Sequence, residues 1–333
     1  MRLRAVQAGL WAVAVLATLA IGGSSANAGV DNVAVCYVPR HHPSYEETIS
    51  VPKKTADYLI RHTLSYLGVC ADYGESAKLG DGKLRVYAQY RGNKPDAIGV
   101  IITRDVFQDL PYEPPTQGLW CYDKDENGTI DQHHECVGGY ENALHFSKKF
   151  RSKVDTPFQY MLINWNPAGH PPPHIYAVPH FDVHFYLNSN EERLAIRPGP
   201  CPVLVNCEDY EKAMKQLDPK YVAPDYSYTE AVEPGMGNHM MDMTTGEWHG
   251  EEWEHSFIYG HFDAEITFYE PMVALTYFEK VLAGKAAKEC FPMKLPQAYQ
   301  KSGWYPTKYC IRYRANRKEV TTSLESFVYR VAS

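Results

Sequence analysis

Short runs in which apolar and polar residues alternate dominate the chain after residue 73 and predict β-strands. In "PHFDVHFY" (residues 179–186), His180, Asp182 and His184 alternate with aromatic and aliphatic residues, which is the period of two typical of a strand. "KLRVYAQY" and "DAIGVIIT" predict two further strands around a Gly-Asn-Lys-Pro turn. "FQYMLINWN", "SFIYG", "EITFYEPM" and "KYCIRYRA" continue the series.

Helical periodicity occurs in only a few segments of this region. "EDYEKAMKQL" is one, and "MVALTYFEKVLAGKAAKE" is another, in which Val273, Leu275, Phe278 and Val281 share a helical face. Strands therefore outnumber helices. Residues 73–333 are predicted to form one mainly β (α+β) domain, either an antiparallel barrel or a sandwich with a few covering helices.

Residues 29–72 have a different pattern and predict a small N-terminal module. A strand near "NVAVCYV", a loop "PRHHPSYEE" and a strand "TISV" precede a helix from about Lys53 to Tyr66. Tyr58, Leu59, His62 and Tyr66 recur at helical spacing, which predicts a helix packed through that face.

The first 28 residues have the layout of a secretory signal peptide. "MRLR" is basic, "AGLWAVAVLATLAIGG" is apolar, and "ANA" ends the segment in small residues. The apolar run is shorter than the roughly 20 residues of a spanning helix. The mature chain is predicted to start near Gly29, to be secreted or periplasmic, and to be soluble without a membrane segment after cleavage.

Composition narrows the classes of partner. The net charge is −7, and 33 basic residues are interleaved with 40 acidic ones, whereas nucleic-acid binding needs a concentrated basic face. No nucleic-acid partner is expected. A small-molecule ligand or substrate and an oligomeric assembly stay open.

Eight cysteines agree with an oxidising compartment. Neighbouring pairs along the chain give one hypothesis out of the roughly 105 pairings that eight cysteines allow. No CxxC pair is present, which argues against a zinc ribbon. The pairs of this hypothesis are Cys36 with Cys70, Cys121 with Cys136, Cys201 with Cys207, and Cys290 with Cys310.

The polar face of residues 180–184 is the strongest candidate for chemistry. On a regular strand, neighbours on one face are about 7 Å apart, so His180 and His184 are about 13 Å apart. Zinc–nitrogen bonds measure only about 2.0–2.1 Å. His180 and His184 therefore cannot easily share one ion without a bulge, whereas either can share one with Asp182.

Further ligands are available elsewhere in the sequence. "GMGNHMMD", interpreted as a Gly-rich loop, carries His239, and its Met240 would favour copper. Glu270 is predicted to share a strand face with Ile266 and Phe268, and an acid among apolar neighbours is paired, metal-bound, or held with a raised pKa. The candidate ligands for zinc, iron, manganese or copper are His180, Asp182, His184, His239 and Glu270, with His170 and Asp242 beside them or at the rim.

Two other interpretations of polar segments stay open. The His-Asp-His row is equally compatible with a solvated sheet face or a structural hydrogen-bond network. Asp123, Asp125 and Asn127 have calcium-loop spacing, but the twelfth position is His134, so a surface turn clamped by a disulfide is the alternative. No nucleophile elbow, Walker loop or dinucleotide fingerprint is present.

Several segments carry a resemblance. "NWNPAGHPPPHIYAVPHFDVHFY", "MGNHMMD", "FIYGHFDAEITFYEPM" and "LPQAYQKSGWYPTKYCIRY" together resemble an uncharacterised family of exported prokaryotic and some fungal proteins, over about residues 73–330. "HFDxHFY" is the most specific part. The resemblance implies no catalytic residue, and since the family usually lacks a histidine at His174 and has YDG where this chain has His261-Phe-Asp263, these two histidines are the weakest candidates. Residues 33–70 resemble a short secreted bacterial module with a VCxVPxxxP pattern.

Two functional hypotheses follow. The first is an exported β-rich protein that binds a divalent metal, with a metal-dependent enzymatic activity left open. The second is a non-catalytic secreted binding or assembly protein, in which the polar strand is structural.

Overall fold

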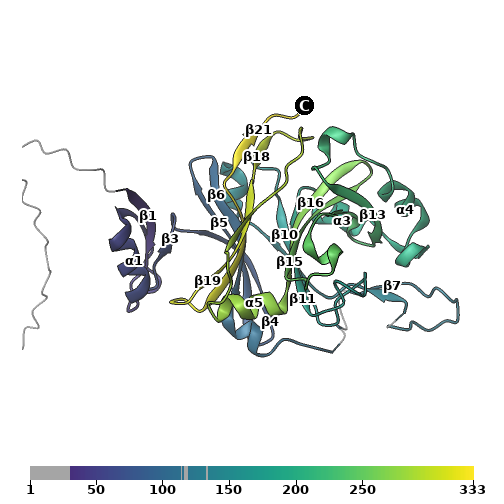
Figure 1. Cartoon of the computed structure of the whole chain (residues 1–333), viewed down its shortest axis with the longest axis horizontal. Helices are drawn as coiled ribbons and strands as arrows, with labels where there is room; N and C mark the ends of the chain where they lie inside the picture. The colour runs from purple at the N-terminus through teal and green to yellow at the C-terminus, as the bar shows by residue number, and fades with distance from the viewer. Residues whose placement is uncertain (1–30, 114, 116–118, 133) are drawn as a thin grey trace, which may run out of the picture.

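The computed structural model describes residues 31–113, 115, 119–132 and 134–333, and the predicted signal peptide lies outside them. Two antiparallel β-sheets face each other, with the N-terminal module at one side (Figure 1). Within these ranges neither sheet closes into a barrel. The mainly β prediction is confirmed, and the architecture is a sandwich.

The two sheets contain strands that are far apart in sequence. The six-stranded sheet consists, in spatial order, of β17 (Cys290–Pro292), β19 (Lys308–Arg314), β20 (Glu319–Glu325), β6 (Lys94–Thr103), β5 (Gly82–Arg91) and β4 (Asp72–Leu79). The seven-stranded sheet consists of β13 (Tyr226–Glu233), β14 (Gly237–Asp242), β15 (His255–Phe262), β16 (Glu265–Ala274), β11 (His180–Tyr186), β10 (Tyr160–Asn166) and β9 (Tyr140–His145).

The remaining elements are short. The strands are β7 (Trp120–Cys121) with β8 (Cys136–Val137), β18 (Gly303–Tyr305) with β21 (Val328–Arg330), and β12 (Pro198–Cys201). The α-helices outside the module are α2 (Lys148–Lys153), α3 (Asn190–Leu194), α4 (Cys207–Ala213) and α5 (Leu275–Leu282), and the 3-10 helices are η1 (Arg104–Gln108), η2 (Pro202–Leu204), η3 (Pro219–Tyr221) and η4 (Gly246–His249). Among the described residues no helix combines the length and the apolar character needed to cross a bilayer.

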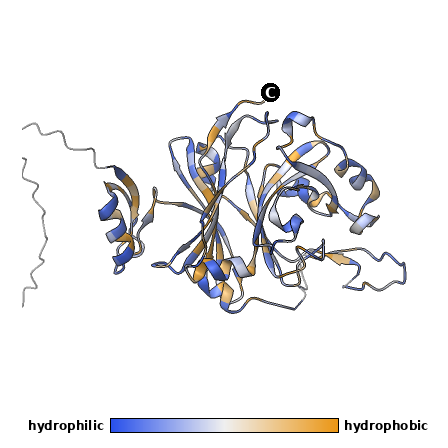
Figure 2. Cartoon of the chain, viewed as in Figure 1, coloured by the Kyte–Doolittle hydropathy of each residue, from blue (hydrophilic) through white to orange (hydrophobic). Residues whose placement is uncertain are grey.

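The main core lies between the two sheets. Phe181, Val183 and Phe185 point from β11 into the same buried cluster as Val86 of β5 and Val100 of β6. Figure 2 shows hydrophobic residues along these strands. Because side chains alternate along a strand, the residues between those of β11 must point to the other side of the seven-stranded sheet.

That other side holds a second buried cluster. Leu162, Tyr186 and Met272 come from the sheet, whereas Tyr176 and Trp253 come from connecting segments and complete the cluster. The segments with α3 and α4 lie on this side (Figure 1), and Trp248 of η4 packs against the same cluster. The polar residues of β11 alternate with those that face the main core, and this second cluster shields them from solvent.

The N-terminal module contains β1 (Asn32–Tyr37), β2 (Glu47–Pro52), α1 (Lys53–His62) and β3 (Tyr66–Leu67). The predicted helix to Tyr66 is wrong at its end, because the N–H and hydroxyl of Thr63 both bond the Leu59 carbonyl and the chain then joins β1 as β3. The predicted buried face is wrong as well: Tyr58 is exposed, and the buried residue of α1 is Ala56.

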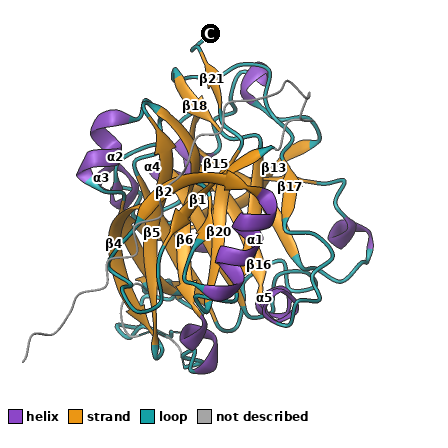
Figure 3. Ribbon diagram, turned by 90° about the vertical axis from the view of Figure 1, so that its left-hand side faces the viewer, coloured by secondary structure: helices purple, strands orange, loops and turns teal. Residues whose placement is uncertain are grey.

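The module lies against the outer face of the six-stranded sheet (Figures 1 and 3). Asn316 Nδ2 donates to the carbonyls of Thr63 (3.0 Å) and Ser65 (2.7 Å). Gln89 Nε2 of β5 donates to the carbonyl of Val69 (2.6 Å). Hydrogen bonds to its backbone therefore fix the module on the sheet.

All four disulfides of the neighbouring-pair hypothesis are present. Each links residues that strand pairing or a short loop has already brought together, with Cα–Cα distances between 4.1 and 5.0 Å. In the described part of the chain no cysteine is free. Four disulfides fit an oxidising, extracellular compartment.

Candidate metal centre

The polar face predicted for β11 is present and buried. His180, Asp182 and His184 are at most 4% exposed. A solvated sheet face is therefore the wrong interpretation of this pattern. Burying three titratable groups costs free energy unless they find partners, so their neighbours decide what the face can do.

His184, His239 and Glu270 form one group, called here the inner trio. His184 Nε2 lies 3.5 Å from Glu270 Oε1, and one ligand atom from each of the three residues lies within 4.8 Å of the others. Each residue comes from a different strand: β11, β14 and β16. All three side chains are buried.

Strand pairing brings Glu270 to His184. The pairs Asp182 with Met272 and Phe185 with Tyr269 place Glu270 across from His184 on the same face. The prediction that Ile266 shares this face is wrong, because the register of β15 and β16 shifts between Gly260 and His261, and Ile266 packs against the main core.

His239 reaches the trio from a strand and not from the predicted Gly-rich loop. Residues 237–242 pair with both β13 and β15. Met240 faces the main core, so alternation turns its neighbour His239 to the opposite side, and Met240 is no metal ligand. Asp242 falls on the Met240 side, where Lys294 Nζ binds it at 2.7 Å, and it does not join the inner trio.

Backbone carbonyls orient both imidazoles of the inner trio. His184 Nδ1 lies 3.3 Å from the Leu162 carbonyl, and His239 Nδ1 lies 2.7 Å from the Ala231 carbonyl. With Nδ1 as the donor, Nε2 keeps its lone pair. His184 Nε2 and Glu270 Oε2 are buried without a hydrogen-bond partner among the described residues. This orientation is common for histidines that bind metals.

His170, His180 and Asp182 form a second group, called here the outer trio. His180 Nε2 lies 3.2 Å from Asp182 Oδ1, and His170 Nε2 lies 3.7 Å from Asp182 Oδ2. Asn166 Nδ2 of β10 donates to Asp182 Oδ2 at 2.6 Å. His180 and His184 thus lie in different groups, in agreement with the distance argument from strand geometry.

The inner trio is electrostatically short of positive charge. Burial lowers the pKa of His184 to about 3 and also lowers that of His239, so both imidazoles are neutral at pH 7. Burial raises the pKa of Glu270 well above its ordinary value, and the negative charges of Asp182 and Glu233 raise it further. A bound cation would relieve this energetic cost of ionising Glu270.

The outer trio contains its own charge compensation. Burial by itself would raise the pKa of Asp182, but His180 and His170 hold it well below the ordinary value. Burial opposes a charge on His170, yet Asp182 raises the pKa of His170 to about 9. Without a metal, an ion pair between His170 and Asp182 is therefore the stable state of this group at pH 7.

A cavity of about 300 Å³ opens near this part of the sheet, and its lining residues do not include the six residues of the trios. Its wall includes Ile258, which pairs with Glu270, and Ser256, which pairs with Met272. Tyr176, whose ring lies 6.0 Å from the His170 ring, lines it as well. The cavity is large enough for a small ligand close to the polar face.

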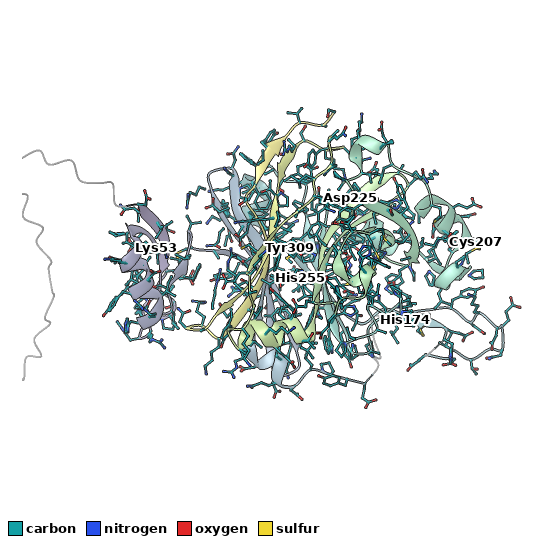
Figure 4. All side chains as sticks on the ribbon, in the orientation of Figure 1. Lys53, His174, Cys207, Asp225, His255 and Tyr309 are labelled. Carbon is teal, nitrogen blue, oxygen red and sulfur yellow. A yellow bond between two sulfur atoms is a disulfide. The ribbon has the colours of Figure 1, made fainter. Side chains whose placement is uncertain are left out.

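Other histidines lie elsewhere. His174 is exposed at the surface, where Figure 4 labels it. His261 is buried beside Tyr228, outside both trios. His255 hydrogen-bonds Tyr309 at 2.9 Å and lies between the two sheets (Figure 4).

The candidate calcium residues lie on the loop between β7 and β8. Asp123 and Asp125 both accept the backbone N–H of Asn127 at 3.1 Å, as in a surface turn. Buried Glu135 is near both aspartates, but it accepts N–H groups of its own loop, including that of Lys124 at 2.6 Å. These contacts build the turn clamped by the disulfide.

Two contributions to the polar face were missed in the sequence. Asn166 supports Asp182, and its place on the alternating segment "NWN" of a neighbouring strand is a signal that could have found it. Trp253, whose ring lies 5.3 Å from that of His180, closes the outer trio from a connecting segment. No periodic signal places Trp253 there.

Comparison of the chain with known protein families, with curated proteins and with solved structures finds no match. The function must therefore be argued from the site itself.

Proposed function

We propose that this chain is an exported metalloprotein that binds one divalent transition metal through His184, His239 and Glu270. The observation that carries the proposal is the arrangement of the inner trio. Two imidazoles, each held through Nδ1 by a backbone carbonyl, converge with a carboxylate in a buried pocket. A structural hydrogen-bond network is expected to satisfy its buried atoms, whereas His184 Nε2 and Glu270 Oε2 have no hydrogen-bond partner among the described residues.

The donor set selects the class of metal. Two nitrogens and one carboxylate oxygen suit zinc, iron, manganese or copper(II), and the eight cysteines are all in disulfides and supply no thiolate. Three protein ligands leave a coordination position open, as in catalytic sites. A metal bound there supplies Lewis-acid chemistry and lowers the pKa of a coordinated water.

The chain's own residues prepare the site for a small substrate. The cavity reaches the strand next to the trio, since Ile258 in its wall pairs with Glu270, and Tyr176 and Trp248 line it with aromatic surface. Phe268 packs against both imidazoles, with its ring centroid 4.9 Å from that of His184 and 5.3 Å from that of His239, and so limits the access of water to them. We infer a metal-dependent enzyme acting on a small oxygen-containing molecule.

Metal analysis of protein purified without chelators tests the proposal. We expect bound transition metal, a lower unfolding temperature after EDTA treatment, and recovery on remetallation. His239→Ala and Glu270→Gln should each lower metal affinity by more than the roughly 10–100-fold that loss of a supporting residue costs. Glu270→Gln keeps the size of the side chain and removes only the charge.

His174→Ala is the matched control, because His174 is exposed and lies outside both trios. This variant should keep the full metal content. A parent protein that is folded, metal-free and insensitive to EDTA would instead support the second hypothesis, a non-catalytic secreted binding or assembly protein with a structural polar face.

A further inference from the structure

The outer trio repeats the geometry of the inner one. Its imidazoles are also held through Nδ1 by backbone carbonyls, His170 by that of Pro171 at 2.9 Å and His180 by that of Val178 at 2.7 Å. Both Nε2 atoms face the carboxylate of Asp182, and the three ligand atoms lie within 4.8 Å of one another. The chain thus presents two sets of two histidines and one carboxylate, five of them on strands of one sheet and His170 on a connection.

Asp182 has the support expected of a metal-binding carboxylate. Asn166 Nδ2 holds Oδ2 at 2.6 Å, which fixes the orientation of the carboxylate. Oδ1 is buried 3.2 Å from His180 Nε2, in a contact that lacks the geometry of a hydrogen bond. Next to it on β10, the buried side chain of Asn164 has no hydrogen-bond partner within the described ranges for either of its polar atoms. An ion-pair network accounts for Asp182 Oδ1 and leaves the two polar atoms of Asn164 unexplained.

The two trios are neighbours with separate ligands. Asp182 and His184 are consecutive residues on one face of β11, so their Cα atoms are about 7 Å apart. No residue belongs to both groups, so neither trio needs to give up a ligand for the other to be filled.

Access differs between the trios. The inner trio is buried, whereas the side chain of His170 is 26% exposed and lies on the connection between β10 and β11. Within that connection, His170 N donates a hydrogen bond of 3.2 Å to the Tyr176 carbonyl, which closes a loop. An ion in the outer trio would be nearer to solvent and would exchange faster than one in the inner trio.

We propose that His170, His180 and Asp182 hold a second divalent transition-metal ion, so that the protein carries a pair of ions on this face. The proposal rests on the proposed function, since the inner trio is taken as the first site.

The test is the stoichiometry of zinc in the full chain. Protein stripped with a chelator is remetallated with Zn²⁺, dialysed, and analysed by mass spectrometry for zinc per chain. We expect about two equivalents for the parent protein and for His174→Ala, and about one for His180→Ala and for His239→Ala. Asp182→Asn is the second outer variant, because it keeps the side-chain size if His180→Ala does not fold.

The outcomes separate the two proposals. One equivalent in the parent protein, lost in His239→Ala and kept in His180→Ala and Asp182→Asn, overturns the second site and leaves the first. No zinc in any protein overturns both.

Co²⁺ gives an independent readout of the outer trio. Its ion should quench the fluorescence of Trp253, because the Trp253 ring lies 5.3 Å from that of His180. The contribution of Trp253 is the part of the emission that the Trp253→Phe substitution removes. Co²⁺ should quench this contribution in His239→Ala and not in His180→Ala. Equal quenching in both variants overturns the outer site.

Discussion

His261 shows at the level of one residue that a buried histidine need not belong to the site. It is fully buried, and neither ring nitrogen has a hydrogen-bond partner within the described ranges. Burial lowers its pKa to about 4, and the charge of His239 acts in the same direction. Since neither nitrogen is bonded and the residue lies outside both trios, His261 costs stability without contributing ligands.

This cost has a defined pH dependence. An imidazole in the unfolded chain has a pKa near about 6.5, so between about pH 6.5 and 4 the unfolded state binds the additional proton. The contribution of His261 to the free energy of unfolding therefore falls as the pH falls through this window. We expect His261→Phe to be more stable relative to the parent protein at about pH 5 than at about pH 8, by on the order of 1–2 kcal/mol.

Urea unfolding at both pH values measures this difference. His249→Phe is the matched control, because His249 is exposed. A stability difference for His261→Phe that is the same at both pH values would contradict the argument.

At the level of elements, a glycine in β15 leaves the space that an aromatic ring beside the inner trio occupies. A Cβ atom on Gly260 would lie 2.1 Å from the Phe268 ring. That ring packs against both His184 and His239. Gly260→Ala must therefore move Phe268, and overpacking of this kind costs about 1–3 kcal/mol.

We expect Gly260→Ala to lower both the free energy of unfolding and the metal affinity. The double variant with Phe268→Leu tests the cause, because the smaller side chain makes room for the new methyl group. Its metal affinity should be higher than that of Gly260→Ala alone, which a double-mutant cycle detects. Additive losses would show that Phe268 does not transmit the effect.

The same elements show what the sequence could and could not reveal. Alternation in β11 predicted one polar face and separated His180 from His184, because strand geometry is local. It could not place Glu270 across from His184, since that depends on the register between strands about ninety residues apart. His170 was expected only beside the site or at its rim. It lies on a loop that folds back so that its ring contacts that of His180, and a loop has no periodic pattern that predicts such a contact.

At the level of the whole molecule, the stability of the module depends more on the sandwich than the stability of the sandwich depends on the module. The module has a small core around Cys36, Val38 and Tyr66, and a disulfide from Cys36 to Cys70 closes it. A core of this size stabilises little by itself. The sandwich has two buried clusters of its own. The contacts between the two parts should therefore matter more to the module.

Asn316 offers a direct test of this dependence. Its amide donates to Thr63 and Ser65, at the point where α1 gives way to β3. Asn316→Ala leaves two backbone carbonyls without these donors, which costs about 1–3 kcal/mol where they stay buried. We expect faster hydrogen exchange of amides in residues 32–67 and unchanged metal content, because both trios lie on the far side of the seven-stranded sheet.

Asn93→Ala, in the turn between β5 and β6, is the control and should leave the exchange unchanged. Exchange that is equally slow in both variants would mean that the module does not depend on the Asn316 hydrogen bonds.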